Sequence, residues 1–258
     1  MTKIVDNPAL LITEIAGQSI ADLASKYGTP CYVYNAEIMA GRIAELAKFD
    51  VIRYAMKACS NLAVLDLMRR HGVVVDTVSL GEIERARASG YETQHPQVPP
   101  IVYTADIFDR ESLQSVIEQQ ISVNLGSPDM IDQYGEAYQA ATQTGGQAPR
   151  REITLRINPG FGDGHSQKTN TGGEQSKHGI WHDQLQQSID QAGRYGLVVT
   201  GLHMHIGSGT DLEHLSQVVT AMEQSAQVVG DQLGTISAGG GLPIPYQAEE
   251  EYLSLIHI

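Results

Sequence analysis

The chain has 258 residues, 41% of them hydrophobic and 18% charged, which supplies a large core and argues against a disordered protein. A formal net charge of −13, without any Lys/Arg-rich run, argues against nucleic acid or anionic lipid as a partner. Two cysteines without metal-type spacing, no signal sequence and no apolar run of ~18–20 residues predict a cytoplasmic protein with no membrane partner.

The first ~35 residues are predicted to stand apart from the rest of the chain. Residues 19–28, "SIADLASKYG", have helical periodicity. Residues 29–35, "TPCYVYN", alternate between apolar and polar side chains, which predicts a strand outside the series that follows. Such a strand needs a partner sheet.

After this region, segments typical of strands and of helices alternate, which is the pattern of a parallel sheet with crossover helices. Helices are predicted within "NLAVLDLMRRHG", "SLGEIERARASG" and "SPDMIDQYGEAYQAATQTGG", because Gly residues close them and Ser-Pro opens the third. The predicted strands are at residues 51–55, 73–79, 101–104, 121–125, 153–157, 198–205 and 235–238.

This alternation predicts a (β/α)8 barrel without its last strand, or alternatively an open doubly wound sheet. The barrel is favoured because the reactive residues fall at or just after the carboxyl ends of strands, where barrel enzymes place their sites. These residues are Lys57, Asp76, Arg156, His205, Gly239, Gly240 and Gly241.

The first of these candidates is Lys57, whose amine can form a Schiff base with a carbonyl cofactor when desolvation keeps it unprotonated. Asp76 is suited to orienting the site or the lysine, and Arg156 to binding a phenolate oxygen or a carboxylate. A surface charge is the alternative for Lys57, and a buried ion pair is the alternative for the other two. Glu82 and His178 are weaker candidates, equally consistent with a helix N-terminal acid and a loop residue.

A long segment at residues 158–179 is rich in Gly, Asn, Ser and Thr, and compact domains seldom carry an idle loop of this length. It predicts a functional loop or lid. In "GLHMHIGSG", His203 and His205 lie two apart on one side of a strand. The ring of His205 can then lie against a flat cofactor, with the hydroxyl of Ser208 on its phosphate. A metal site and a pair of structural histidines are the alternatives.

The segment "SAGGGLPIPY" places three consecutive glycines directly after a strand. Backbone N–H groups without side chains can approach a phosphate closely, and late βα loops of barrels often do so. The segment has neither the lysine of a Walker loop nor the G-x-G-x-x-G spacing. A flexible turn is the alternative.

Together these motifs resemble the diaminopimelate decarboxylase family, pyridoxal-phosphate enzymes with an alanine-racemase-like barrel. The resemblance runs from about residue 31 to residue 246. It is carried in order by "RYAMKACSN", "VDTVSLGEIERA", "RINPGFGDGHSQKTNTGGEQSKHGIW", "GLHMHIGSG" and "SAGGGLPIPY".

The resemblance implies decarboxylation of meso-diaminopimelate to lysine and carbon dioxide, with pyridoxal phosphate as cofactor and an amino acid as substrate. It implies that Lys57 forms the Schiff base, that His205 stacks on the pyridine ring, and that Ser208 with residues 239–241 holds the phosphate. Arg156 is then expected near the 3-oxygen of the cofactor, and Asp76 near the lysine. The full enzyme is expected to be a homodimer.

The end of the chain departs from the family pattern after "PIPYQAEEEYLSLIHI". We expect the eighth barrel strand and most of a β-rich second domain to be absent, and "SLIHI" to be foreign to the family. Residues 1–35 are expected to pack with that second domain, and residues 36–258 to form the truncated barrel. A fragment of this kind is expected to be inactive alone. A noncatalytic binding protein, or a metal-dependent hydrolase using His203 and His205, is the alternative function.

Overall fold

The chain divides into two compact units, Met1–Ile52 and Arg53–Ile258. The computed structural model describes residues 12–95, 97–145, 148–162, 171–173, 176–208 and 211–242. In the first unit, an antiparallel pair of two-residue strands precedes two helices that Ser19 and Asn35 cap at their N-termini. These elements are β1 (Glu14–Ile15), β2 (Gln18–Ser19), α1 (Ile20–Tyr27) and α2 (Ala36–Glu45).

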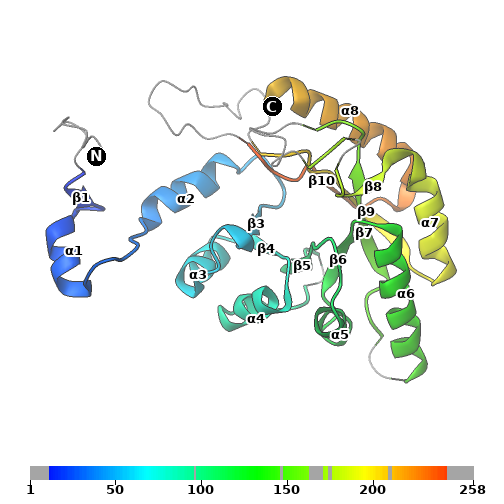
Figure 1. Ribbon diagram of the computed structural model, residues 1–258, viewed down its shortest axis with the longest axis horizontal. Coiled ribbons are helices and arrows are strands. Elements are labelled where there is room, and N and C mark those ends of the chain that lie inside the picture. Colours follow the sequence, from blue (N-terminus) through cyan, green and yellow to red (C-terminus); the bar gives the residue numbers. More distant parts are fainter. Residues whose placement is uncertain are drawn as a thin grey trace, which may run out of the picture. The chain divides into compact units, whose positions relative to one another are not determined.

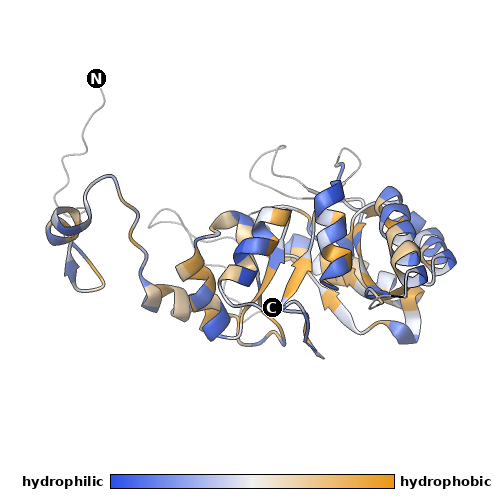
Figure 2. Cartoon of the chain, turned by 90° about the horizontal axis from the view of Figure 1, so that it is seen from below, coloured by the Kyte–Doolittle hydropathy of each residue, from blue (hydrophilic) through white to orange (hydrophobic). Residues whose placement is uncertain are grey.

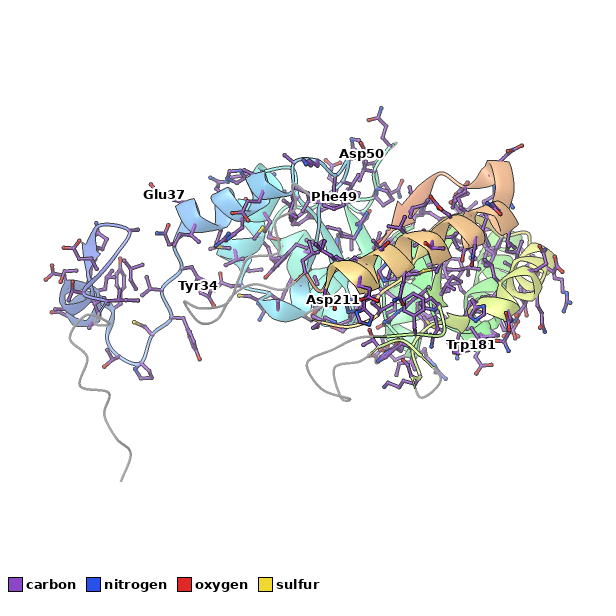
Figure 3. The ribbon with its side chains drawn as sticks, turned by 90° about the horizontal axis from the view of Figure 1, so that it is seen from above. Tyr34, Glu37, Phe49, Asp50, Trp181 and Asp211 are labelled. Atoms are coloured by element: carbon purple, nitrogen blue, oxygen red, sulfur yellow. The ribbon has the colours of Figure 1, made fainter. Side chains whose placement is uncertain are left out.

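The strand predicted at residues 29–35 is wrong. This stretch joins α1 to α2 without regular structure, and Figure 3 labels Tyr34 on it. A strand needs hydrogen bonds to a neighbouring strand, and β1 and β2, which pair with each other, are the strands described in this unit. Tyr32 is 93% exposed, so the alternating pattern here does not divide a buried face from a solvent face.

The second unit is α/β, with a parallel sheet curled into a half-barrel, as predicted (Figure 1). All seven predicted strands are confirmed, and in the described residues their order in the sheet is β10-β9-β7-β6-β5-β4-β3, with the short strand β8 paired to β7. The strands are β3 (Arg53–Ala55), β4 (Val74–Thr77), β5 (Ile101–Tyr103), β6 (Ser122–Leu125), β7 (Glu152–Asn158), β8 (Ile180–Trp181), β9 (Val198–His203) and β10 (Thr235–Ser237).

The α-helices of this unit line the convex side of the sheet (Figure 1). Most begin at a residue whose side chain accepts a hydrogen bond from the first turn, as Asp109 does from the N–H of Ser112 at 2.7 Å. The predictions for the three quoted segments are confirmed by α3, α4 and α6. The helices are η2 (Met56–Ala58), α3 (Leu62–Arg70), α4 (Leu80–Ala88), α5 (Arg110–Glu118), α6 (Pro128–Gln143), η3 (His182–Gln184), α7 (Leu185–Arg194), α8 (Leu212–Val229) and η4 (Gly230–Gln232).

The two faces of the sheet differ in chemistry, because successive residues of a strand point to opposite faces. Apolar strand residues pack against the helices in one buried cluster that includes Val75, Tyr103 and Leu155. Figure 2 shows hydrophobic residues in the strands of this unit, and both hydrophobic and hydrophilic residues along its helices. The strand positions between the apolar ones point to the concave face, and many of them are polar.

Parts of three predictions lie outside the described residues. The predicted loop at 158–179 includes residues 163–170 and 174–175, which are not described. The "PIPY" segment and the final "SLIHI" also lie outside the described part of the chain.

Candidate functional site

Three polar residues share one level of the concave face at the carboxyl ends of β7, β9 and β10. The register pairs Arg156 with His203, and His203 with Ser237. Nδ1 of His203 lies 2.9 Å from Oγ of Ser237. Burial, reinforced by the positive charge of Arg156, lowers the pKa of His203 to about 3, so its ring is neutral at physiological pH. His203 is therefore a hydrogen-bonded interior histidine.

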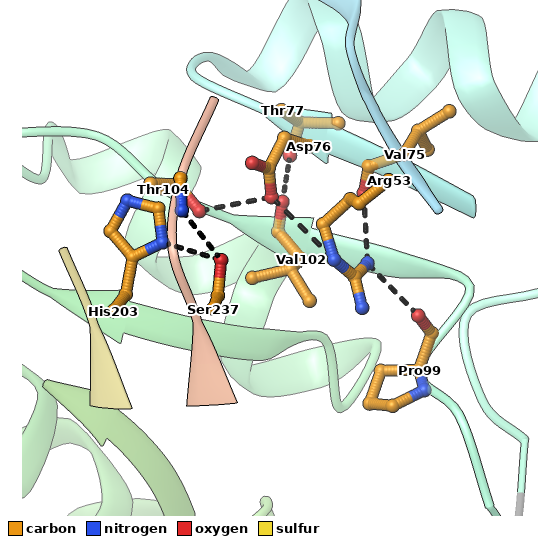
Figure 4. Close-up of polar contacts among 10 residues, drawn as sticks. Arg53, Val75, Asp76, Thr77, Pro99, Val102, Thr104, His203 and Ser237 are labelled. Carbon is orange, nitrogen blue, oxygen red and sulfur yellow. Dashed lines mark hydrogen bonds and ion pairs between the residues drawn. The ribbon is translucent and has the colours of Figure 1, made fainter. Parts of the chain in front are cut away.

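A second group of polar contacts surrounds Asp76 on β4 (Figure 4). Thr104 donates its hydroxyl to Oδ1 of Asp76 at 3.1 Å, and Nε of Arg53 lies 3.9 Å from the same oxygen. Arg53 also donates to the carbonyls of Val75 and Pro99, at 3.3 and 3.1 Å. Burial raises the pKa of Asp76, and the positive charge of Arg53 counteracts this.

Asp106, in the loop after β5, contacts two residues from distant parts of the sequence. Nη1 of Arg156 donates to Oδ1 of Asp106 at 3.3 Å. Nδ1 of His178 lies 2.8 Å from Oδ2 of Asp106. This is within ion-pair distance, but the angles do not meet the geometry of a hydrogen bond. Burial lowers the pKa of Arg156, whereas Asp106 raises it. One carboxylate therefore links two of the sequence-derived candidates.

The glycine stretch packs against the segment that follows β9. A Cβ on Gly239 would collide with the backbone of Met204 and the side chain of His205, and one on Gly241 would collide with the backbone of Gly207. Both glycines have positive φ, +76° and +91°. By contrast, a Cβ on Gly240 would meet no atom within 4 Å. The turn therefore lies directly on residues 204–207 and presents its middle residue to open space.

His205 contacts this glycine stretch and lies within electrostatic range of two cations. Burial is the largest cause that lowers its pKa, to about 4, followed by the positive charges of Arg156 and Lys57. Its Nδ1 is buried and has no hydrogen-bond partner among the described residues. The ring is thus neutral at physiological pH and keeps one unused polar atom.

Lys57 lies in η2, directly after the carboxyl end of β3, and is exposed. Its charge lowers the pKa of both Asp76 and His205, so its ammonium lies within electrostatic range of both side chains. Ser208 is also exposed. The structure thus brings together Lys57, Asp76, Arg156 and His205 in one electrostatic neighbourhood, with the glycine stretch beside it.

Glu82 has a local role. It lies in the first turn of α4, where Oε2 accepts from the N–H of Val78 at 2.8 Å, and the N–H of Glu82 donates to Oγ of Ser79 at 3.3 Å. This is the helix N-terminal acid expected as the alternative for this residue. Its carboxylate also raises the pKa of Asp76 slightly, as the smallest of several causes.

Within the described part of the chain, no three His, Cys, Asp or Glu side chains converge as a metal site requires. Among the same residues, no helix combines the length and the apolar character needed to cross a bilayer.

Sequence reasoning missed Asp106 and Arg53. Asp106 lies two residues past the strand predicted at 101–104, so a carboxylate just past a strand end was the available signal. Arg53 occupies a strand position that pairs with Val74 on the concave face, and although it opens the motif "RYAMKACSN", no role of its own was predicted for it.

Comparison with known proteins gives one consistent result. Residues 39–258 match the family model described as "Pyridoxal-dependent decarboxylase, pyridoxal binding domain". The diaminopimelate decarboxylase of Escherichia coli K12 is 50% identical over 246 residues, 95% of this chain and 56% of that protein. The enzyme of the same name from Streptomyces coelicolor is 51% identical over 230 residues, 89% of this chain and 50% of that protein.

Solved structures agree with these sequence matches. A crystal structure of diaminopimelate decarboxylase aligns with a TM-score of 0.82 at 52% identity, covering 91% of this chain and 53% of the other. The Helicobacter pylori enzyme complexed with L-lysine aligns with a TM-score of 0.75 at 26% identity, covering 89% and 58%. The chain therefore spans about half the length of the curated relatives that it matches.

Proposed function

The chain belongs to the pyridoxal-dependent decarboxylase family, and from this premise we propose that it holds pyridoxal phosphate and serves the decarboxylation of meso-diaminopimelate to L-lysine and carbon dioxide. The relatives of about 50% identity are named for this activity, and a more distant one was solved with L-lysine. The amino-acid substrate, the reaction and a homodimeric, cytoplasmic enzyme are parts of this proposal.

The observation that carries the proposal is the fit of the glycine stretch to a phosphate group. Gly239 and Gly241 can pack on residues 204–207 because they lack a Cβ, while Gly240 faces open space. Backbone N–H groups that an anion can reach without a side chain in between are what phosphate binding requires. We assign the phosphate to residues 239–241 and Ser208.

The electrostatics around this stretch suit a planar, anionic cofactor. His205 has a neutral ring and a buried Nδ1 without a partner, so it can lie against a heteroaromatic ring or hydrogen-bond to it. Arg156 and Lys57 supply positive charge within electrostatic range of His205. The residues present therefore fit pyridoxal phosphate, which when bound supplies an electron sink for the pair left by departing carbon dioxide.

The remaining candidates hold charges and orient the nucleophile. Lys57 is proposed to bind the aldehyde carbon through its amine, and Asp76 to orient that amine with its carboxylate. Arg53 and Thr104 hold Asp76 in place, at 3.9 and 3.1 Å from Oδ1. Arg156 is proposed to bind the oxygen next to the aldehyde, as a cation that does not lose its proton.

We also propose that residues 1–35 pack against the second domain of the whole enzyme, and that residues 36–258 form the cofactor-binding barrel. Large apolar side chains in the first segment support this, because Ile12 is 72% exposed and Tyr27 is 66% exposed.

The cofactor part of the proposal is tested by trapping. The chain is incubated with pyridoxal phosphate, reduced with borohydride, digested and mapped by mass spectrometry. We expect the reduced adduct on Lys57 in the wild type and in Lys48→Ala, and no adduct at this position in Lys57→Ala. An adduct found mainly on Lys48, or spread over surface lysines, would reject Lys57 as the attachment site.

The chain alone is expected to be inactive, so the reaction is tested in the whole enzyme. The measurement is release of carbon dioxide from meso-diaminopimelate, with ornithine and arginine as competing substrates. Release that is equal in the wild type and in Lys57→Ala contradicts the proposed chemistry. Release from ornithine or arginine in preference to meso-diaminopimelate contradicts the proposed substrate.

A further inference from the structure

Asp106 connects two parts of the site that are far apart in sequence. Its Oδ1 accepts from Arg156 at 3.3 Å, and its Oδ2 lies 2.8 Å from Nδ1 of His178. Arg156 comes from the end of β7, whereas His178 comes from the segment that returns to the sheet as β8. The two oxygens of one carboxylate therefore hold a strand and a returning segment at a fixed separation.

Arg156 needs such a partner because of its surroundings. Its side chain is 12% exposed, and burial lowers its pKa, which means that the guanidinium has lost much of its hydration. A planar cation with several N–H donors can turn toward any nearby oxygen unless one of them is fixed. Gly126 lies beside this pair, since a Cβ there would be in ordinary van der Waals contact with Gly179 at 3.9 Å and with Arg156 and Asp106 at 4.0 Å.

The segment that leads back to the sheet as β8 is held by several contacts. Among its described residues, His178 is the one that contacts Asp106. Asn158 accepts from the N–H of Gly173 at 2.9 Å and donates to its carbonyl at 3.1 Å. Ile180 pairs with Ile157 of β7. Between these fastenings, His178 meets Asp106, so the carboxylate controls how residues 176–179 lie beside Arg156.

We infer that Asp106 is a positioning residue, which directs the guanidinium of Arg156 into the site and anchors residues 176–179 at its edge. The part that concerns Arg156 rests on the proposed function, because it assigns this guanidinium to the cofactor. The part that concerns residues 176–179 is independent of any ligand. Asp106 itself touches neither the glycine stretch nor Lys57 in the contacts described.

The test compares Asp106→Ala with a matched control, Asp66→Ala. Asp66 also contacts two cations, Arg69 at 2.8 Å and Arg70 at 2.6 Å, and its side chain is 30% exposed against 34% for Asp106. Asp66 lies on α3, away from the site residues. The control therefore removes a comparable carboxylate without affecting the site.

The first readout uses the chain without cofactor. Hydrogen exchange of the amides at 176–181, and the emission of Trp181, the single tryptophan of the chain, report on the returning segment (Figure 3). We expect faster exchange and an altered emission in Asp106→Ala only. Unchanged exchange and emission, or equal changes in Asp66→Ala, overturn the anchoring role.

The second readout is the dissociation constant of pyridoxal phosphate. We expect it to rise about tenfold in Asp106→Ala, since a hydrogen bond to a charged group is lost, and to stay unchanged in Asp66→Ala. Asp106→Asn keeps an acceptor oxygen for Arg156 and should restore most of the affinity. A dissociation constant that is unchanged in Asp106→Ala overturns the role toward Arg156. If the wild type itself binds no pyridoxal phosphate, the proposed function fails, and exchange and emission still decide the anchoring role.

Discussion

Replacing Arg53 by Met tests whether the concave face depends on its charge pairing. The substitution keeps a long apolar stem and removes the guanidinium, which lies 3.9 Å from Asp76 and donates to two backbone carbonyls, those of Val75 and Pro99. Asp76 is then left with Thr104 as its described hydrogen-bond donor, at 3.1 Å. The matched control is Arg70→Met, since Arg70 also pairs with an aspartate but its side chain is 70% exposed.

The expected cost follows from burial. Removing one partner of a buried pair costs about 3–5 kcal/mol, and removing an exposed one costs about 0–1 kcal/mol. Because the carboxylate of Asp76 is still 23% exposed and keeps its bond from Thr104, we expect Arg53→Met to lower the free energy of unfolding by about 2–3 kcal/mol. For Arg70→Met we expect less than ~0.5 kcal/mol.

The cost should also depend on pH. The charge of Arg53 is the largest of the causes that counteract the rise in the pKa of Asp76, so this pKa rises further in the variant. A carboxyl whose pKa is higher in the folded than in the unfolded state takes up its proton first in the folded state, so stability is regained as pH falls. We therefore expect the difference between Arg53→Met and the wild type to shrink between pH 7 and pH 5.

Urea unfolding at pH 7 and pH 5 measures these free energies of unfolding. It is carried out on the wild type, the two single variants and the double variant Arg53→Met/Asp76→Leu. The double variant should recover much of the loss, because no uncompensated charge remains. An Arg53→Met variant no less stable than Arg70→Met, or a loss that grows toward pH 5, would refute the reasoning.

Three further expectations concern buried histidine and glycine positions. Burial lowers the pKa of His203 to about 3, so below about pH 6.5 the unfolded state binds a proton that the folded state does not, and stability falls on acidification. In urea unfolding, the wild type should therefore lose up to ~3 kcal/mol more stability between pH 6.5 and pH 4 than His203→Asn. Gly135→Ala should lower the free energy of unfolding by about 1–3 kcal/mol, because its Cβ would collide with the ring of Tyr195. A Cβ at Gly193 in α7 would meet no atom within 4 Å, so Gly193→Ala should be neutral or stabilising by up to ~1 kcal/mol. Equal melting temperatures for the two variants would contradict this. Gly239→Ala should reduce retention of pyridoxal phosphate in gel filtration, because φ there is +76° and the new methyl group collides with residues 204 and 205; retention equal to the wild type would speak against the phosphate assignment.

Much of the fold is predictable because its rules are local. Apolar runs gave the strands, and side chains such as those of Ser79 and Ser127 mark the first turns of helices through hydrogen bonds over three residues. The same alternation failed at residues 29–35, where periodicity was present but a partner strand was not. A pattern within one segment cannot report whether a neighbour exists.

The site was predictable in part for a related reason. Lys57 and Arg156 stand at strand ends, and parallel strands bring such ends together at one edge of a sheet. Asp106 also follows a strand, but its importance lies in two contacts to residues far along the chain, which only the folded structure brings together. Arg53 shows the same limit, since its partners come from β4 and from the loop before β5.

The separation of the sheet into an apolar convex face and a polar concave face bears on how proteins of this architecture diverge. Val102 and Asn124 alternate along their strands with Tyr103 and Val123, which belong to the packed cluster beneath the helices. Selection can therefore exchange side chains at inward positions, and so alter which small molecule is accepted, while the outward positions keep the hydrophobic core intact. Core packing and ligand recognition therefore depend on alternate residues of the same strands.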